Sequence, residues 1–171
     1  TNERGAIVVN DTCESSVPGV YAVGDVNGGP QFTYISLDDF RIVFGALTGN
    51  GQYTLKDRKN IPYTTFLTPP LARVGLTEED AINKGYTVKT KEMLVATMPR
   101  AHVNDYLKGA FKIVVNAENN LILGATLYSQ GAEELINLIK MAMDNNIPYT
   151  YFKNQIFTHP TMAENLNDLC N

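Results

Sequence analysis

The sequence has few cysteines, no long apolar run and no excess of positive charge. Only Cys13 and Cys170 are present, nearly the whole chain apart, so neither a C-x-x-C zinc site nor a local redox disulfide can form. A bridge between these two cysteines is one interpretation. Two free thiols in a reducing cytoplasm is the interpretation that we favour.

Two further absences limit the kinds of partner that this chain is expected to bind. No apolar run approaches the roughly 20 residues that are needed to span a bilayer. The formal net charge of −4 argues against a protein that reads a nucleic-acid backbone, because such proteins concentrate Lys and Arg. We therefore expect a cytoplasmic protein that binds neither membrane nor nucleic acid. The first residue is Thr1 rather than Met, so we also expect the chain to begin within a longer protein.

The composition is that of a folded chain with a substantial core. Apolar residues make up 44% and charged residues 19% of the 171 residues, which argues against disorder. This length suits one domain, or one domain plus part of another. Residues 56–62 are polar and charged with few apolar anchors, and we place a domain boundary there, between residues 1–58 and 59–171.

The first part of the chain predicts strands followed by a helix. Residues 5–9 and 20–23 are short β-branched runs, and the second is apolar on both faces, as in a strand buried in a parallel sheet. Ser36 and Asp39 have the spacing of a capping box at the start of a helix that ends at Gly49. The residues predicted to form the apolar face of this helix are Leu37, Phe40, Val43, Phe44 and Leu47.

The second part predicts an α+β domain. Strands are expected at residues 63–67 and within 86–98, and a hairpin at 110–116 and 121–128. Helices are expected to begin at Thr77, to span 131–143 with Leu135, Leu138, Ile139 and Ala142 on one face, and to span 161–169, with a short one within 146–157. Strands followed by segregated helices indicate a sheet with helices packed against it.

A first candidate site follows the strand predicted at residues 20–23. Gly24 would let a ligand approach the backbone closely, and Asp25 offers two acceptor oxygens to the hydroxyl groups of a ribitol or ribose. In open α/β sheets ligands lie outside the carboxyl ends of the strands, and the next helix would point its N-terminal amides to the same region. The alternative is that Asp25 only begins a turn and Gly24 relieves strain.

A second candidate site is His159 with Glu164, five residues later. Pro160 fixes one backbone angle after the histidine, and Thr161 can cap the helix that contains Glu164. A carboxylate that accepts an N–H from one ring nitrogen fixes the tautomer and favours the imidazolium, and the other nitrogen can then exchange protons. The alternative is a purely structural pair.

Two other features have simpler explanations. His102 lies in a predicted loop, and although it could act as an acid/base or bind a metal with His159, no ligand spacing supports a metal site. We expect a solvated loop residue and no metal. The tyrosines of residues 148–152 could stack on bases, but the acidic balance favours packing in the core or at a subunit interface.

Four segments of the chain resemble one family. Thr12 with Val17-Pro18-Gly19-Val20-Tyr21-Ala22-Val23-Gly24-Asp25 is similar to the second FAD-binding motif of the flavoprotein disulfide reductases, which include glutathione reductase, lipoamide dehydrogenase and mercuric reductase. Residues 66–78, and Gly124-Ala125 together with residues 131–134, resemble the dimerisation domain of that family. His159-Pro160-Thr161 with Glu164 resembles its C-terminal signature.

The resemblance implies a fold and roles for particular residues. It implies an antiparallel dimerisation domain with helices on one side, preceded by a remnant of an α/β FAD-binding domain. It implies that Asp25 binds the ribityl chain of FAD beside Gly24, and that a backbone N–H at Phe32 or Thr33 reaches the pyrimidine edge of the flavin. It further implies a homodimer in which His159, oriented by Glu164, assists thiol chemistry at the disulfide of the partner subunit.

Several parts of such an enzyme are missing from these residues. There is no G-x-G-x-x-G fingerprint for FAD or NAD(P)H and no redox-active cysteine pair. We therefore expect the isolated chain to bind no FAD and to be inactive, and the parent enzyme to use FAD and NAD(P)H. Its substrate would be a small disulfide, a metal ion or an oxidant. Cys170 alone disfavours mercury, because mercuric reductases carry a cysteine pair near that end. The alternative is a non-catalytic dimerisation module.

Overall fold

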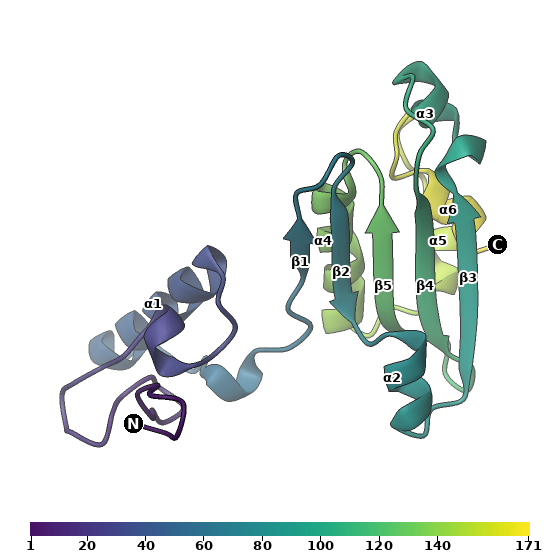
Figure 1. Ribbon diagram of the computed structural model, residues 1–171. Helices are drawn as coiled ribbons and strands as arrows, with labels where there is room; N and C mark the ends of the chain where they lie inside the picture. The colour runs from purple at the N-terminus through teal and green to yellow at the C-terminus, as the bar shows by residue number, and fades with distance from the viewer. The chain divides into compact units, whose positions relative to one another are not determined.

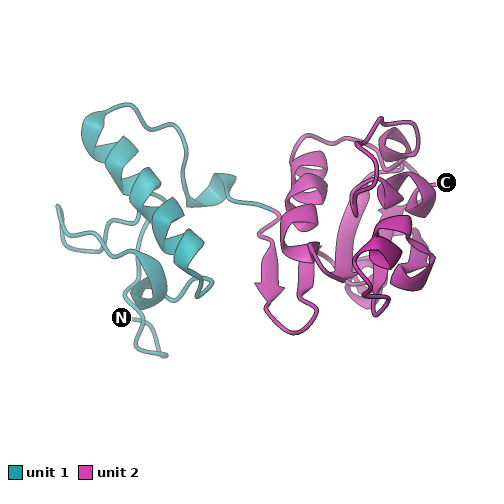
Figure 2. Ribbon diagram, turned by 90° about the horizontal axis from the view of Figure 1, so that it is seen from above, with its two compact units in different colours: residues 1–59 teal, residues 60–171 magenta.

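The computed structural model describes residues 1–171, which form two compact units, Thr1–Lys59 and Asn60–Asn171 (Figure 2). The division between them falls inside the polar stretch of residues 56–62. Each unit has its own internal packing. No helix in either unit has the length and apolar character that a membrane crossing needs.

The first unit contains helices but no regular strand. Its elements are the 3-10 turn η1 (Gly24–Asn27), the helix α1 (Thr33–Thr48) and the 3-10 turn η2 (Leu55–Asp57). The strands predicted at residues 5–9 and 20–23 are wrong: only the isolated bridges Val9–Ser15 and Glu14–Tyr21 form there. A strand of a parallel sheet needs neighbouring strands to take up its backbone hydrogen bonds, and residues 1–59 supply none.

Helix α1 begins four residues earlier than predicted and buries a different face. Phe32 is its N-cap, and Ser36 and Asp39 form no capping box, which corrects that prediction. The predicted apolar face is largely exposed, with Phe40 and Phe44 each 57% exposed. The residues that α1 buries are instead Ile35, Asp39 and Ile42. Their spacing of four and three residues follows one helical face, but a charged residue occupies its centre.

The second unit is built on a sheet of five antiparallel strands, in the order β1-β2-β5-β4-β3 (Figure 1). The two strands of the predicted hairpin lie near its centre, with Ile113 opposite Ala125. The predicted strand within residues 86–98 is shorter, because the 3-10 turn η3 (Val95–Thr97) follows it directly. The strands are β1 (Tyr63–Thr65), β2 (Leu71–Gly75), β3 (Val88–Leu94), β4 (Ala110–Asn116) and β5 (Ile122–Tyr128).

The helices α4, α5 and α6 cover one face of this sheet. The longest of them, α4, packs on β2 and β5, while α6 packs on β3 and on α5, as Figure 1 shows. The helices of the unit are α2 (Glu78–Asn83), α3 (Pro99–Val103), α4 (Ala132–Asp144), α5 (Thr150–Lys153) and α6 (Asn165–Leu169). The predicted α+β fold of an antiparallel sheet with helices is therefore confirmed. The last helix is four residues shorter than the predicted span of residues 161–169, because residues 161–164 form a separate turn.

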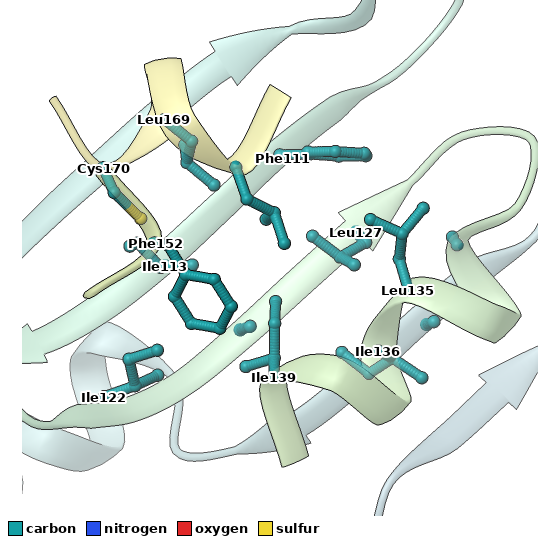
Figure 3. Packing of buried hydrophobic residues seen from close by; sticks show 14 of the residues in the cluster. Phe111, Ile113, Ile122, Leu127, Leu135, Ile136, Ile139, Phe152, Leu169 and Cys170 are labelled. Carbon is teal, nitrogen blue, oxygen red and sulfur yellow. The ribbon is translucent and has the colours of Figure 1, made fainter. Parts of the chain in front are cut away.

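The core lies between the sheet and these helices. Alternate residues of the strands point into it, among them Phe111, Ile113 and Leu127, and Ile139 of α4 meets them (Figure 3). Burial of such side chains stabilises the fold by about 1.5–3 kcal/mol each. Leu138, predicted on the buried face of α4, is 39% exposed, since it lies one position off the stripe that contacts the sheet.

Both cysteines are free, as predicted, and both are buried. Burial raises the pKa of the Cys13 thiol to about 11 and that of the Cys170 thiol to about 12. Only the thiolate attacks alkylating reagents or disulfides. At pH 8 we expect iodoacetamide to modify either residue in the folded protein at least about 100-fold more slowly than a free cysteine peptide. Peptide mass spectrometry with and without urea measures this, and rapid labelling of the folded protein would contradict the burial.

Candidate functional site

The first candidate site is the turn that carries Asp25. Gly24 has a φ of 72°, and a Cβ placed on it would lie 2.6 Å from Oγ of Ser36 in helix α1. Glycine suits this position because a side chain would displace the Ser36 hydroxyl and would strain the backbone at this positive φ. Asp25 follows in η1 with its side chain exposed, so its carboxylate is available to a ligand.

A buried carboxylate that the sequence did not reveal holds this turn. Asp39 is fully buried, and its Oδ2 accepts hydrogen bonds from the Gly24 amide at 2.7 Å and from Nδ2 of Asn27 at 2.8 Å. Its Oδ1 accepts from the guanidinium of Arg58. The signal that could have found Asp39 is its place between Ile35 and Ile42 on the buried face of α1, where a charge needs a partner.

The start of α1 offers a hydrogen-bond donor. Thr33 is the first residue of the helix and is exposed, and its amide donates to no group within the chain. The preceding residue, Phe32, has an extended backbone and forms no side-chain cap. Unpaired amides at a helix N-terminus attract electronegative atoms. The exposed Asp25 carboxylate and the Thr33 amide therefore offer an acceptor and a donor, the kinds of group that the resemblance implies for the hydroxyl groups and the pyrimidine edge of a flavin.

The second candidate site brings His159 and Glu164 together. Nδ1 of His159 lies 2.7 Å from Oε2 of Glu164, so the contact predicted from the sequence is confirmed. The imidazole is 69% exposed, whereas the carboxylate is 19% exposed. A carboxylate beside Nδ1 favours the tautomer that carries the proton on this nitrogen, which leaves Nε2 of an exposed ring as the nitrogen that could exchange protons.

A reciprocal turn fixes Glu164 in place. Its Oε1 accepts a hydrogen bond from the Thr161 amide at 3.0 Å, and its own amide donates to Oγ1 of Thr161 at 3.3 Å. Oγ1 of Thr161 in turn donates to the carbonyl of Thr158 at 2.7 Å. This is the arrangement of a capping box, placed just before α6. One carboxylate oxygen thus holds the backbone while the other holds the imidazole.

These contacts keep Glu164 ionised. The hydrogen bond to His159 holds the pKa of Glu164 below its usual range, and the Thr161 amide acts in the same direction against partial burial. A lowered folded-state pKa stabilises the fold above the ordinary range of glutamate, and this contribution is lost as the pH falls through the lowered value. The Glu164–His159 pair therefore persists to a more acidic pH than an ordinary glutamate would allow.

The loop that carries His159 forms a hydrogen bond with helix α3. Nη1 of Arg100, in α3, donates to the carbonyl of Pro160 at 3.4 Å. His102 belongs to the same helix, which corrects its predicted place in a loop, and its Nε2 lies 2.8 Å from the carbonyl of Ala96. No group of three or more His, Cys, Asp or Glu side chains is arranged to hold a metal ion.

Comparison with known proteins places the chain in a family. The family model described as "Pyridine nucleotide-disulphide oxidoreductase, dimerisation domain" matches residues 61–170. The chain belongs to the pyridine nucleotide-disulphide oxidoreductases. A second model of this oxidoreductase family, described without a domain name, matches residues 1–39. The first match covers the sheet and its helices as well as His159 and Glu164, and the second covers the turn of Asp25.

Relatives in this oxidoreductase family match nearly the whole chain. The probable pyridine nucleotide-disulfide oxidoreductase RclA of Escherichia coli is 49% identical over 168 residues, which are 98% of this chain and 38% of that protein. Mercuric reductase of Staphylococcus aureus is 34% identical over 97% of this chain and 30% of its own length. The solved structure of HOCl-induced flavoprotein disulfide reductase RclA from Escherichia coli superposes with a TM-score of 0.95, at 48% identity, over 99% of this chain and 39% of that one.

Proposed function

We propose that this chain supplies two parts of an NAD(P)H-dependent flavoprotein reductase: a flavin-contacting turn and an acid/base pair that acts across a homodimer. The observation that carries the proposal is the 2.7 Å contact between Glu164 and the exposed imidazole of His159. An imidazole oriented by a carboxylate and open on its other side is the arrangement that activates sulfur nucleophiles. The whole protein is the enzyme in this proposal, and the chain alone is inactive.

The flavin end of the proposal rests on Gly24, Asp25, Phe32 and Thr33. Asp25 accepts hydrogen bonds from ribityl hydroxyl groups, Gly24 allows the close approach, and the Thr33 amide after Phe32 donates to the pyrimidine edge. When bound, FAD would carry electrons from NAD(P)H to a cysteine pair supplied by another part of the protein. This chain contributes the groups that hold and orient the cofactor, and residues 1–59 alone are too small to enclose it.

At the other proposed site, His159 transfers protons. We propose that its outward ring nitrogen takes a proton from, and returns it to, a thiol of the partner subunit, while Glu164 stabilises the imidazolium that forms. The turn of Thr161 and the contact of Arg100 with Pro160 hold the ring in one orientation. Fixed orientation matters because a displacement of about 1 Å can lower the rate of such a step by roughly 100-fold.

The proposed substrate is a small disulfide, a metal ion or an oxidant. Relatives of this chain include mercuric reductases and dihydrolipoyl dehydrogenases, and RclA is described as HOCl-induced and has been solved as a Cu(II) complex. Cys170 is buried with a raised pKa, so it is unsuited to deliver a metal ion to the site. A reductase of the RclA kind is therefore favoured over a mercuric reductase.

A non-catalytic dimerisation module is the second candidate, because the sheet and its helices alone could serve that purpose. The fit of Asp25 and Thr33 to a flavin opposes it, since a dimer module needs neither group. We expect the full-length protein to purify yellow, with bound FAD, and to elute as a homodimer. Absorbance at about 450 nm and light scattering measure both properties. A colourless monomer would end the proposal, and a colourless dimer would support the module.

A further inference from the structure

We propose that Asp39 is a positioning residue for the flavin, and that its buried carboxylate fixes the turn that carries Asp25. The inference rests on the proposed function, because it assumes that Asp25 contacts the cofactor. Asp39 binds the turn from within helix α1 and is not proposed to touch the flavin itself. Asp39 is fully buried in helix α1, so its effect must pass through the groups that it binds.

One oxygen of Asp39 holds both sides of Asp25. Oδ2 accepts from the amide of Gly24, the residue before Asp25, and from Nδ2 of Asn27, two residues after it. Oδ1 of Asn27 also accepts a hydrogen bond from the Gly29 amide at 3.0 Å, so the hydrogen bonds that start at Asp39 continue into the following loop. The backbone of Asp25 is therefore fixed to helix α1 at two points.

The turn of residues 24–28 needs hydrogen bonds from outside it to keep one backbone conformation. Gly24 and Gly28 have φ angles of 72° and 78°, and glycine has many accessible backbone conformations. Ordering the backbone of one residue costs about 1–2 kcal/mol. Hydrogen bonds to a charged acceptor stabilise by about 1.5–3 kcal/mol each, so two bonds to Asp39 can offset that cost.

Helix α1 also carries the other group proposed to contact the flavin. The Thr33 amide lies at its first residue, and Asp39 lies six residues, or less than two turns, further along the same helix. Because Asp39 holds the turn of Asp25, both groups keep a fixed distance and orientation relative to one rigid element. A preorganised pair of this kind reduces the conformational freedom that is lost when the cofactor binds.

Arg58 pairs with the buried charge of Asp39 and so offsets the cost of its burial. The neighbouring Asp38 binds the same cation and provides a matched control. The guanidinium of Arg58 binds Oδ1 of Asp39, and its Nε binds Oδ2 of Asp38 at 2.7 Å. Asp38 also contacts Tyr53 and Arg41 but no group of the turn. The two neighbouring acids therefore share the same cation, and only Asp39 reaches residues 24–27.

The test compares Asp39→Asn, Asp38→Asn and Asp25→Ala in the full-length protein. Asparagine keeps the size of Asp39 but has one acceptor oxygen, so it cannot serve both Arg58 and the turn. We expect Asp39→Asn to raise the Kd for FAD about tenfold or more, and Asp38→Asn to change it less than about twofold. Flavin fluorescence during titration of the apoprotein measures Kd, and thermal unfolding of each apoprotein controls for folding.

The double variant Asp25→Ala/Asp39→Asn decides whether Asp39 acts through Asp25. We expect its Kd to equal that of Asp25→Ala within about twofold, because coupled residues are not additive. An unchanged Kd in Asp39→Asn, or fully additive effects, would overturn the inference. A normal Kd in Asp25→Ala would instead remove the proposed role of Asp25 itself. If Asp39→Asn does not fold, Asn27→Ala takes its place, since it removes one hold and leaves Arg58 paired, and a Kd equal to that of the unsubstituted protein would again overturn the inference.

Discussion

Replacing His159 by alanine in the full-length protein is expected to lower kcat for a small disulfide by about 100-fold. Loss of a positioned acid/base group reduces rates by roughly 10²–10⁴-fold. Since the imidazole is exposed and lies outside the core, the variant should keep its flavin content and its unfolding temperature. Steady-state assays with NAD(P)H and a disulfide measure the effect.

Two companion variants separate a protonic role from a structural one. His102→Ala removes the other histidine, whose ring forms a hydrogen bond with the carbonyl of Ala96 and none with the His159 loop, and we expect a normal rate. Glu164→Gln removes the charge beside Nδ1 but can keep the hydrogen bond of the Thr161 amide, and we expect a smaller loss of about tenfold. Normal turnover by His159→Ala would contradict the proposed role.

Replacing Asp25 by alanine is expected to release FAD from the purified protein. The variant loses both acceptor oxygens that are proposed to bind ribityl hydroxyl groups, and hydrogen bonds to a charged group contribute about 1.5–3 kcal/mol each. Since one such hydrogen bond corresponds to roughly 10- to 100-fold in affinity, we expect Kd for FAD to rise at least about tenfold. The ratio of flavin absorbance to protein absorbance after dialysis gives the retained fraction.

The control for this variant is Asp11→Ala, which removes another acid of the same unit. Asp11 pairs with Lys56 and contacts no residue of the turn, so its loss should leave the flavin bound. Asp25→Asn keeps one acceptor oxygen and should retain more FAD than Asp25→Ala. Full flavin occupancy of Asp25→Ala after dialysis would rule out the role of Asp25.

The fold of the second unit was largely predictable, because its signals are local. The hairpin strands of residues 110–116 and 121–128 alternate apolar residues, and Thr77 with Asp80 forms a capping box that begins α2. The first unit was less predictable. Residues 20–23 have the composition of a buried strand, but a parallel strand forms only beside neighbours that residues 1–59 do not contain.

The two candidate sites also differ in how far the sequence could predict them. The contact of His159 with Glu164 was predictable, because five residues with a turn between them bring the two side chains together. The partners of Asp39 were not, because Gly24 lies 15 residues before it and Arg58 lies 19 residues after it. Long-range pairs of this kind leave no periodic pattern in a sequence. The apolar spacing of α1 also suggested the wrong buried face, since two faces of that helix are apolar.

The turn formed by Thr161 and Glu164 couples the proposed chemistry to the start of α6. One oxygen of Glu164 binds the backbone that leads into α6, and the other binds the ring of His159. Local unfolding of residues 161–164 therefore also releases the imidazole from its carboxylate. In the proposed enzyme, warming would then lower activity while most of the ellipticity remains, because the pairing of the sheet strands lies within residues 63–128.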